Sequence, residues 1–331
     1  MPLHAPTPAR PAPVRAALAL LTALAAVVAL LGTTGAAPAR AADGDLPVPY
    51  GFIPAALLAG VPPDQNPPGA NDWNCRPSAA HPRPVVLVHG IVGNRATNWP
   101  TYAPLLKNNG YCVFSLTYGQ YYPFPLNQFG GLGDIRASAQ ELKVFVDRVL
   151  TATGASEVDL VGHSEGTVMP GYYLKFLGGA AVVKRHVSIA PLWKGTDTLG
   201  GATLARLGQP FGLSAPVLGL IGAGAPSVPQ LLAGSEYFAE LRSGGSPFVP
   251  GVEYTNIVTK YDGVVTPYTS GIEDGATNIT IQDLCPTDFS DHLQIVSDPV
   301  TARVVLNALD PANAQPVRCR VVLPLVGGLL G

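Results

Sequence analysis

The chain has 331 residues, of which 47% are apolar and 13% are charged, and its formal net charge is -2. This length suits one large α/β domain with a sizeable core, and the apolar content argues against disorder. The slightly acidic balance, without a basic stripe, argues against nucleic-acid binding.

The N-terminal residues have the order of a secretory signal peptide. Arg10 and Arg15 precede an apolar run over residues 16–31, and small residues with an Ala-X-Ala pattern follow. A basic start, an apolar middle and a small-residue cleavage site are typical of an export signal that is removed. The alternative, an uncleaved membrane anchor, is disfavoured because the run is short for a bilayer span. We expect residues 1–41 to be a signal peptide, residues 42–331 to be the mature chain, and the protein to be secreted.

Four cysteines lie beyond this segment, at Cys75, Cys112, Cys285 and Cys319. An even number in an exported chain predicts two disulfides, because the compartment is oxidising. Three pairings can be drawn, and we favour the two local loops, Cys75–Cys112 and Cys285–Cys319. Free buried thiols are the alternative. The spacings match no zinc pattern, and we expect neither a metal nor a cofactor.

The first part of the mature chain contains two expected strands. Residues 43–80 are rich in Pro, Asn and Ala and are expected to be irregular. Residues 85–88 form a continuous apolar run, typical of a strand buried on both faces. Residues 100–109 predict a helix that a proline opens and a glycine ends. Residues 111–117 predict the second strand.

Strands and helices then alternate. The expected elements are a helix over 135–149, strands at 158–161, 182–189, 255–259 and 278–281, and a last helix over 299–309. This alternation predicts an α/β fold with a mostly parallel central sheet and helices on both faces. Residues 195–250 break the rhythm and are expected to be a cap-like insertion. Its apolar part, residues 207–232, is interpreted as a mobile cap or the wall of a binding site, or as an insertion packed on the body.

One motif indicates the chemistry. The sequence Gly162-His163-Ser164-Glu165-Gly166 directly follows the strand expected at residues 158–161. G-x-S-x-G in this place predicts a nucleophile elbow, a tight strand-to-helix turn that exposes the serine side chain. A serine hydroxyl needs a base to take its proton, and that base needs a partner that fixes its tautomer. Ser164 is therefore the candidate nucleophile.

Two histidines follow Ser164. His186 lies inside an expected strand and is interpreted as structural, whereas His292 lies in a polar loop, where a catalytic base is expected. Asp262 follows an expected strand and precedes a glycine, so its carboxylate should lie at the carboxyl edge of the sheet. We take His292 as the base and Asp262 as the acid. The competing carboxylates are Asp197, Asp274, Asp283, Asp288 and Asp291.

An oxyanion hole requires two backbone donors. The N–H groups of Glu165, which follows the nucleophile, and of Ile91, in the loop after the first expected strand, are the candidates. Each would contribute about 3 kcal/mol of transition-state stabilisation. The side chains of His163 and Glu165 are expected to serve the turn rather than the reaction.

Taken in order, these motifs carry a resemblance. They are Val88-His89-Gly90-Ile91, Asn98-Trp99, Gly162-His163-Ser164-Glu165-Gly166, Tyr261-Asp262-Gly263-Val264-Val265 and Asp291-His292. Over about residues 75–310 the chain resembles the secreted bacterial lipases of the class 2 lipase family, within the α/β-hydrolase fold. The resemblance implies carboxyl-ester hydrolysis through an acyl-serine intermediate, with the nucleophile, acid and base on Ser164, Asp262 and His292. Many relatives have Gln where Glu165 stands and Gly where Thr167 stands.

The sequence leads to three alternative hypotheses for the function. The first is a secreted lipase or esterase, expected to be a monomeric triacylglycerol lipase that acts on ester or lipid substrates at a lipid–water interface. The second is an acyltransferase that uses the same elbow but passes the acyl group to an alcohol other than water. The third is a non-catalytic binding protein on an inactive scaffold. A missing serine, histidine or acid would favour the third, and candidates for all three residues are present.

Overall fold

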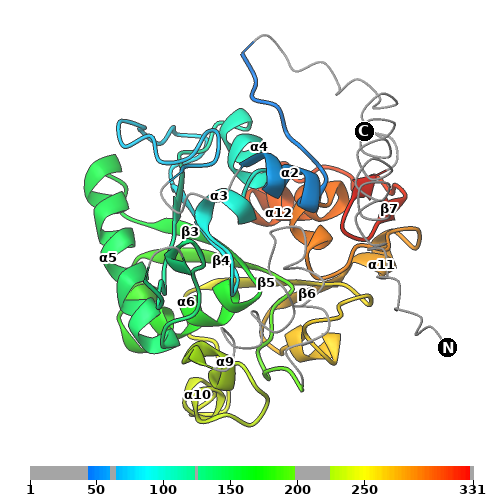
Figure 1. Cartoon of the computed structure of the whole chain (residues 1–331). Coiled ribbons are helices and arrows are strands. Elements are labelled where there is room, and N and C mark those ends of the chain that lie inside the picture. Colours follow the sequence, from blue (N-terminus) through cyan, green and yellow to red (C-terminus); the bar gives the residue numbers. More distant parts are fainter. Residues whose placement is uncertain (1–43, 60–64, 124–125, 198–223, 329–331) are drawn as a thin grey trace, which may run out of the picture. The chain divides into compact units, whose positions relative to one another are not determined.

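The computed structural model describes residues 44–59, 65–123, 126–197 and 224–328 (Figure 1). All described residues belong to one compact unit within Ala41–Leu329. The expected signal peptide, residues 1–41, lies outside the described residues, as does the part of the insertion over residues 198–223.

A sheet of six parallel strands forms the centre of the fold, in the order β2-β1-β3-β4-β5-β6. The strands are β1 Val85–Val88, β2 Val113–Leu116, β3 Val158–His163, β4 Val183–Ile189, β5 Glu253–Val258 and β6 Thr277–Thr280. Each overlaps a strand expected from the sequence, which confirms the α/β prediction. The strand order reverses between β1 and β3, where Val88 pairs with Gly162. Ligands of open α/β sheets bind beyond the carboxyl ends of the strands at such a point.

The helices extend along both faces of this sheet (Figure 1). The described α-helices are α2 Phe52–Ala59, α3 Arg95–Asn98, α4 Tyr102–Asn108, α5 Ile135–Thr153, α6 Glu165–Phe176, α9 Ser227–Gln230, α10 Glu236–Leu241, α11 Ile281–Leu284 and α12 Pro299–Leu309. Short 3-10 helices span Leu126–Gln128, Gly179–Ala181, Tyr268–Gly271, Gln294–Ser297 and Pro311–Asn313. Near the C-terminus, β7 Val322–Leu323 and β8 Gly327–Gly328 form a small antiparallel pair.

Side chains of β1 alternate between two hydrophobic cores. Val85 and Leu87 pack with residues of α4 and α12 on one face of the sheet. Val86 and Val88 pack with residues of α5 and α6 on the other face. All four side chains are fully buried. A strand between two helical layers needs apolar residues at every position, which explains the continuous run in the sequence.

Capping residues set both ends of helix α5 and the start of helix α12. The side chain of Asp134 accepts hydrogen bonds from the first turn of α5, and Gly154 ends the helix in a left-handed conformation with φ of 73°. Asp298 caps α12, and Pro299 occupies its first turn. These residues satisfy backbone groups that have no partner within the helix, and they fix the helix boundaries.

Helix α2 lies in a segment that the sequence predicted to be irregular, so that part of the prediction was wrong. Phe52 and Ala56 are buried in the core beside α4 and α12. The N–H of Phe52 donates to the side-chain oxygen of Gln294 at 3.0 Å. Contacts with distant residues therefore order this helix, and its own sequence carries no clear helical pattern.

Residues 224–250 show what the described part of the insertion does. They contain α9 and α10, and Tyr237, Phe238 and Leu241 of α10 belong to the same core as α5 and α6. The hydroxyl of Tyr237 donates to the carbonyl of Val168 in α6 at 2.8 Å. This part of the insertion packs on the body of the domain.

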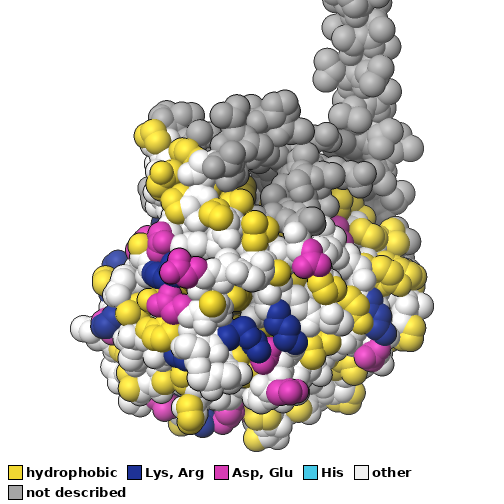
Figure 2. Space-filling model, turned by 90° about the horizontal axis from the view of Figure 1, so that it is seen from below, with side chains coloured by type: hydrophobic (Ala, Val, Ile, Leu, Met, Phe, Trp, Pro, Cys, Tyr) yellow, Lys and Arg dark blue, Asp and Glu magenta, His cyan; other side chains and the backbone are white. Residues whose placement is uncertain are grey.

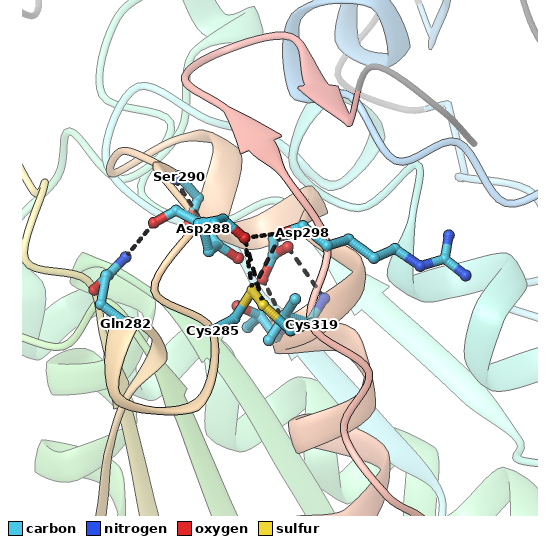
Figure 3. Close-up of a disulfide and its surroundings, with 10 residues drawn as sticks. Gln282, Cys285, Asp288, Ser290, Asp298 and Cys319 are labelled. Carbon is cyan, nitrogen blue, oxygen red and sulfur yellow. Dashed lines mark hydrogen bonds between the residues drawn. A yellow bond between two sulfur atoms is a disulfide. The ribbon is translucent and has the colours of Figure 1, made fainter.

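Two disulfides close the loops that the sequence favoured. Cys75–Cys112 ties the N-terminal segment to the residue before β2, and Cys285–Cys319 joins the end of α11 to the C-terminal segment. Figure 3 shows Asp288 and Asp298 lying beside the second disulfide. Burial, with the Asp288 carboxylate adding to it, raises the pKa of Asp298 to about 8.

Acidic and basic side chains intermingle on the face of the molecule drawn in Figure 2. This mixture agrees with the small formal net charge of -2. Within the described ranges, no helix is both long enough and apolar enough to cross a membrane.

Candidate active site

Ser164 occupies a strained turn between β3 and α6. Its φ of 55° and ψ of -124° lie outside the regions that a serine ordinarily adopts. The two flanking glycines make the turn possible, because a Cβ on Gly162 would overlap the carbonyl oxygen of Gly166. A Cβ on Gly166 would overlap the carbonyl oxygens of Val88 and His89. The turn therefore packs directly against the end of β1. The serine side chain projects away from both the strand and the helix that the turn joins.

The structure brings together Ser164, His292 and Asp262, which the sequence selected from three distant segments. His292 Nε2 lies 2.9 Å from Ser164 Oγ. His292 Nδ1 lies 2.7 Å from Asp262 Oδ2. Because a carboxylate can only accept, Nδ1 carries the proton and Nε2 faces the serine hydroxyl as an acceptor. Such an arrangement can remove the serine proton while the histidine ring is held in one tautomer.

Asp262 is fixed by its own turn after β5. Its Oδ1 accepts hydrogen bonds from the N–H groups of Val264 at 2.9 Å and Val265 at 2.8 Å. With Oδ1 held in this way, Oδ2 is directed at His292. The Asp262 and His292 side chains are only 3% and 5% exposed, so little water competes for these hydrogen bonds.

The competing residues have other roles. His186 is buried in β4, burial lowers its pKa to about 3, and neither ring nitrogen has a hydrogen-bond partner among the described residues. Asp291 uses its side chain to accept from the N–H groups of Leu293 and Gln294, and Asp288 accepts from that of Ser290. These aspartates shape the loop that carries His292.

The candidate oxyanion donors adjoin Ser164 from two segments. Glu165 is the first residue of α6, so its N–H has no acceptor within the helix. Ile91 follows Gly90, whose hypothetical Cβ would lie 3.0 Å from the Cβ of Ser164. The loop after β1 therefore contacts the serine closely. The positive end of the α6 dipole also favours negative charge beside Ser164.

The sequence did not reveal the environments of the two residues that flank the serine. His163 is buried, and its Nε2 lies 2.9 Å from the carbonyl oxygen of His292. The Glu165 side chain is fully buried, and burial raises its pKa well above the usual value. Among the described residues, no group of three or more His, Cys, Asp or Glu is arranged to hold a metal ion.

The fold and this arrangement define the class of protein, an α/β-hydrolase. Two solved structures share the fold. Lipase B of Aspergillus fumigatus aligns with a TM-score of 0.58 and 19% identity, covering 87% of this chain and 65% of its own. The mature form of the Bacillus licheniformis lipase BlEst2 aligns with a TM-score of 0.50 and 17% identity, covering 75% of this chain and 95% of its own.

The family follows from the sequence. The family described as Lipase (class 2) matches residues 82–305, and the chain belongs to it. Triacylglycerol lipases of Pseudarthrobacter phenanthrenivorans and Burkholderia plantarii are each 31% identical to this chain over 99 residues. These alignments cover 28% of this chain, and 28% and 25% of the two relatives. The chain therefore matches only about a quarter of the length of these curated relatives.

Proposed function

We propose that the protein is a secreted carboxyl-ester hydrolase of the triacylglycerol lipase type. Ser164 is the nucleophile, His292 the general base and Asp262 the acid that orients it. The observation that carries this proposal is the continuous pair of contacts from Ser164 Oγ to His292 Nε2 at 2.9 Å and from His292 Nδ1 to Asp262 at 2.7 Å. Membership of the class 2 lipase family supports the same chemistry.

The reaction has two halves. His292 Nε2 takes the hydroxyl proton as Ser164 Oγ bonds to the ester carbonyl carbon, and negative charge moves to the carbonyl oxygen. The N–H groups of Ile91 and Glu165 donate to that oxygen, each contributing about 3 kcal/mol. The carbon–oxygen bond to the alcohol then breaks, and His292 returns its proton to the departing alcohol. Water repeats the sequence on the acyl-serine and releases the carboxylic acid.

Two exposed aromatic side chains support contact with a lipid surface. Tyr261 precedes Asp262, and Phe289 lies three residues before His292. These side chains are 45% and 38% exposed, and their ring centroids lie 5.4 Å apart. An exposed aromatic pair, carried by the two segments that also carry Asp262 and His292, supports contact with an apolar substrate surface. We expect the enzyme, acting as a monomer, to hydrolyse emulsified triacylglycerol faster than the same ester dissolved as single molecules.

Export is supported by the two disulfides, because such bonds persist in oxidising compartments. We propose that residues 1–41 form a signal peptide that is removed. N-terminal sequencing of protein collected from the culture medium should begin at residue 42. Recovery of the chain in the membrane fraction with its first residues intact would exclude this part of the proposal.

The activity is tested with purified mature protein and p-nitrophenyl esters of short and long acyl chains. Ser164→Ala should lower kcat by at least about 10³-fold while the fold is retained, because the nucleophile is lost. A serine-directed phosphonate should label the wild-type protein at Ser164 and leave the variant unlabelled. Retained hydrolysis in the variant would exclude the proposed role. Formation of a new ester in the presence of a competing alcohol, without release of acid, would identify an acyltransferase instead.

A further inference from the structure

His163 lies at the junction of the three segments that build the site. It is the last residue of β3 and directly precedes Ser164. Its Nε2 lies 2.9 Å from the main-chain carbonyl oxygen of His292. Its Nδ1 lies 3.1 Å from the side-chain oxygen of Asn98, and this oxygen also accepts from the N–H of Gly90 at 3.4 Å. A single buried ring therefore connects the strand of the nucleophile with the loop of the base and with the loop after β1.

The partners of the ring determine where its proton lies. A carbonyl oxygen can only accept, so Nε2 must carry the hydrogen that faces His292. The His163 ring is 2% exposed, and burial, together with the neighbouring His292 ring, lowers its pKa well below the usual value. The ring is therefore neutral, and Nδ1 has no hydrogen. The side chain acts as a donor toward His292 and as an acceptor toward Asn98.

This assignment also orients the amide of Asn98. An acceptor at Nδ1 requires the amide nitrogen to face the ring, since two acceptors would repel each other. Asn98 is 4% exposed, and its Nδ2 has no partner among the described residues when the amide oxygen faces the ring. Turning the amide gives the buried nitrogen a partner at 3.1 Å on the ring, in exchange for the longer 3.4 Å contact between the amide oxygen and the N–H of Gly90. Asn98 and His163 then form one directional chain of donors that ends at the His292 carbonyl.

We propose that His163 is a positioning residue that holds the main chain of His292 at a fixed distance from Ser164, and that it transfers no proton in the reaction. This inference rests on the proposed function, because it assigns His292 as the base. The hydrogen bond anchors a loop residue to the end of a strand in the centre of the sheet. The sequence separation of 129 residues between the two partners shows how distant the joined segments are.

The neutral state of His163 matters for the reaction. His292 becomes positively charged when it takes the serine proton, and the two ring centroids are 5.0 Å apart. A charged His163 at that distance would oppose this step, whereas a neutral donor does not. A displacement of the base by about 1 Å is enough to cost about 10²-fold in rate, so a fixed main chain is valuable.

The decisive comparison is between His163→Gln and His163→Met. The two replacements have nearly the same length and shape, but only Gln carries a donor that reaches the His292 carbonyl. His186→Met is the matched control, because His186 is a fully buried histidine on the adjacent strand whose ring nitrogens lack partners in the described part of the chain. Rates are expressed per serine titrated with phosphonate, so only folded sites are counted.

We expect His163→Met to lower kcat at least tenfold with KM changed less than twofold, because the ring positions the base and does not contact the substrate. His163→Gln should recover most of this loss, and His186→Met should keep the wild-type kcat. If the Met variant does not fold, His163→Leu, which also lacks a donor, takes its place. A wild-type kcat per titrated serine in the donor-free variant, or a Gln variant as slow as the Met variant, would overturn the proposal.

A second measurement is independent of activity. Nitrogen-15 NMR of the histidine-labelled protein should show His163 as the neutral tautomer protonated at Nε2 at pH 7. Protonation at Nδ1, or at both nitrogens, would overturn the inference even if the enzyme is active. Absence of ester hydrolysis in the wild-type protein would instead refute the proposed function, so the two failures are distinguishable.

Discussion

We predict that the free energy of unfolding depends on pH through the buried carboxyl group of Glu165. The side chain is fully buried at the start of α6. Burial raises its pKa well above the usual value, and neither carboxyl oxygen has a hydrogen-bond partner among the described residues. The folded protein therefore keeps this proton over a pH range in which the unfolded chain has released it. Glu165→Gln preserves the size and the neutral state of the side chain but cannot ionise.

The sign and size of the effect follow from proton linkage. Where the folded state binds one more proton than the unfolded state, the free energy of unfolding falls by about 1.4 kcal/mol per pH unit. In the wild-type protein, Glu165 makes this contribution from the unfolded pKa of about 4.3 up to the raised folded value. Below that window both states are protonated and the contribution is constant. The stability of Glu165→Gln relative to the wild type should therefore increase as the pH rises above about 4.5.

The measurement is equilibrium urea unfolding of both proteins between pH 4 and pH 8, with the disulfides intact. Other buried acids, such as Asp298, titrate in both proteins and cancel in the difference. Glu165→Leu is the control, because it also removes the titration. The difference in unfolding free energy between Glu165→Leu and the wild type should change with pH at the same slope as that for Glu165→Gln. Only the constant offset between the two differences should vary. If the unfolding free energy of Glu165→Gln relative to the wild type stays constant between pH 5 and pH 7, the conclusion that the fold keeps Glu165 protonated is refuted.

Three further predictions follow from the contacts. Asp262→Asn should lower kcat by about 10³- to 10⁴-fold, because the amide cannot hold His292 in the required tautomer; a loss below tenfold per titrated serine would contradict the assigned role. Replacing both Cys285 and Cys319 with Ser should reduce the free energy of unfolding by about 4 kcal/mol, given a sequence separation of 34 residues, and chemical unfolding measures it. Leu142→Ala, in the fully buried stripe of α5, should cost about 2–5 kcal/mol in urea unfolding, while kcat per folded molecule stays at the wild-type value.

Much of the fold could be predicted because buried strands and capped helices leave local signals. The run Val85–Val88 is apolar at every position, since helices pack on both of its faces. Asp298 and Pro299 mark the start of α12. The Asp298 side chain accepts hydrogen bonds from N–H groups of the first turn, and Pro299 has no N–H group that would need a partner. Such signals depend on neighbours in the sequence, so they are visible without the structure. Helix α2 lacked them because Gln294 and the core order it from a distance.

The candidate site was predictable for a different reason. The elbow motif identifies Ser164 locally, and parallel strands carry their C-terminal loops to one edge of the sheet. Asp262 follows β5 and therefore arrives at that edge, and His292 was the remaining histidine in a loop. The partners of His163 had no such signal. The spacing between His163 and His292 reveals nothing about a hydrogen bond from a ring to a main-chain carbonyl.

The elbow explains why both residues beside Ser164 are buried and neutral. The turn directs the serine outward only because its neighbours pack inward, His163 at the end of β3 and Glu165 at the start of α6. Burial penalises charge on either side chain, and it lowers the pKa of His163 and raises that of Glu165. The proposed reaction creates a positive charge on His292 and a negative charge on the substrate oxygen. Neutral neighbours leave these two charges to interact with Asp262 and with the backbone donors, so the same packing that exposes the serine also keeps competing charges out of the site.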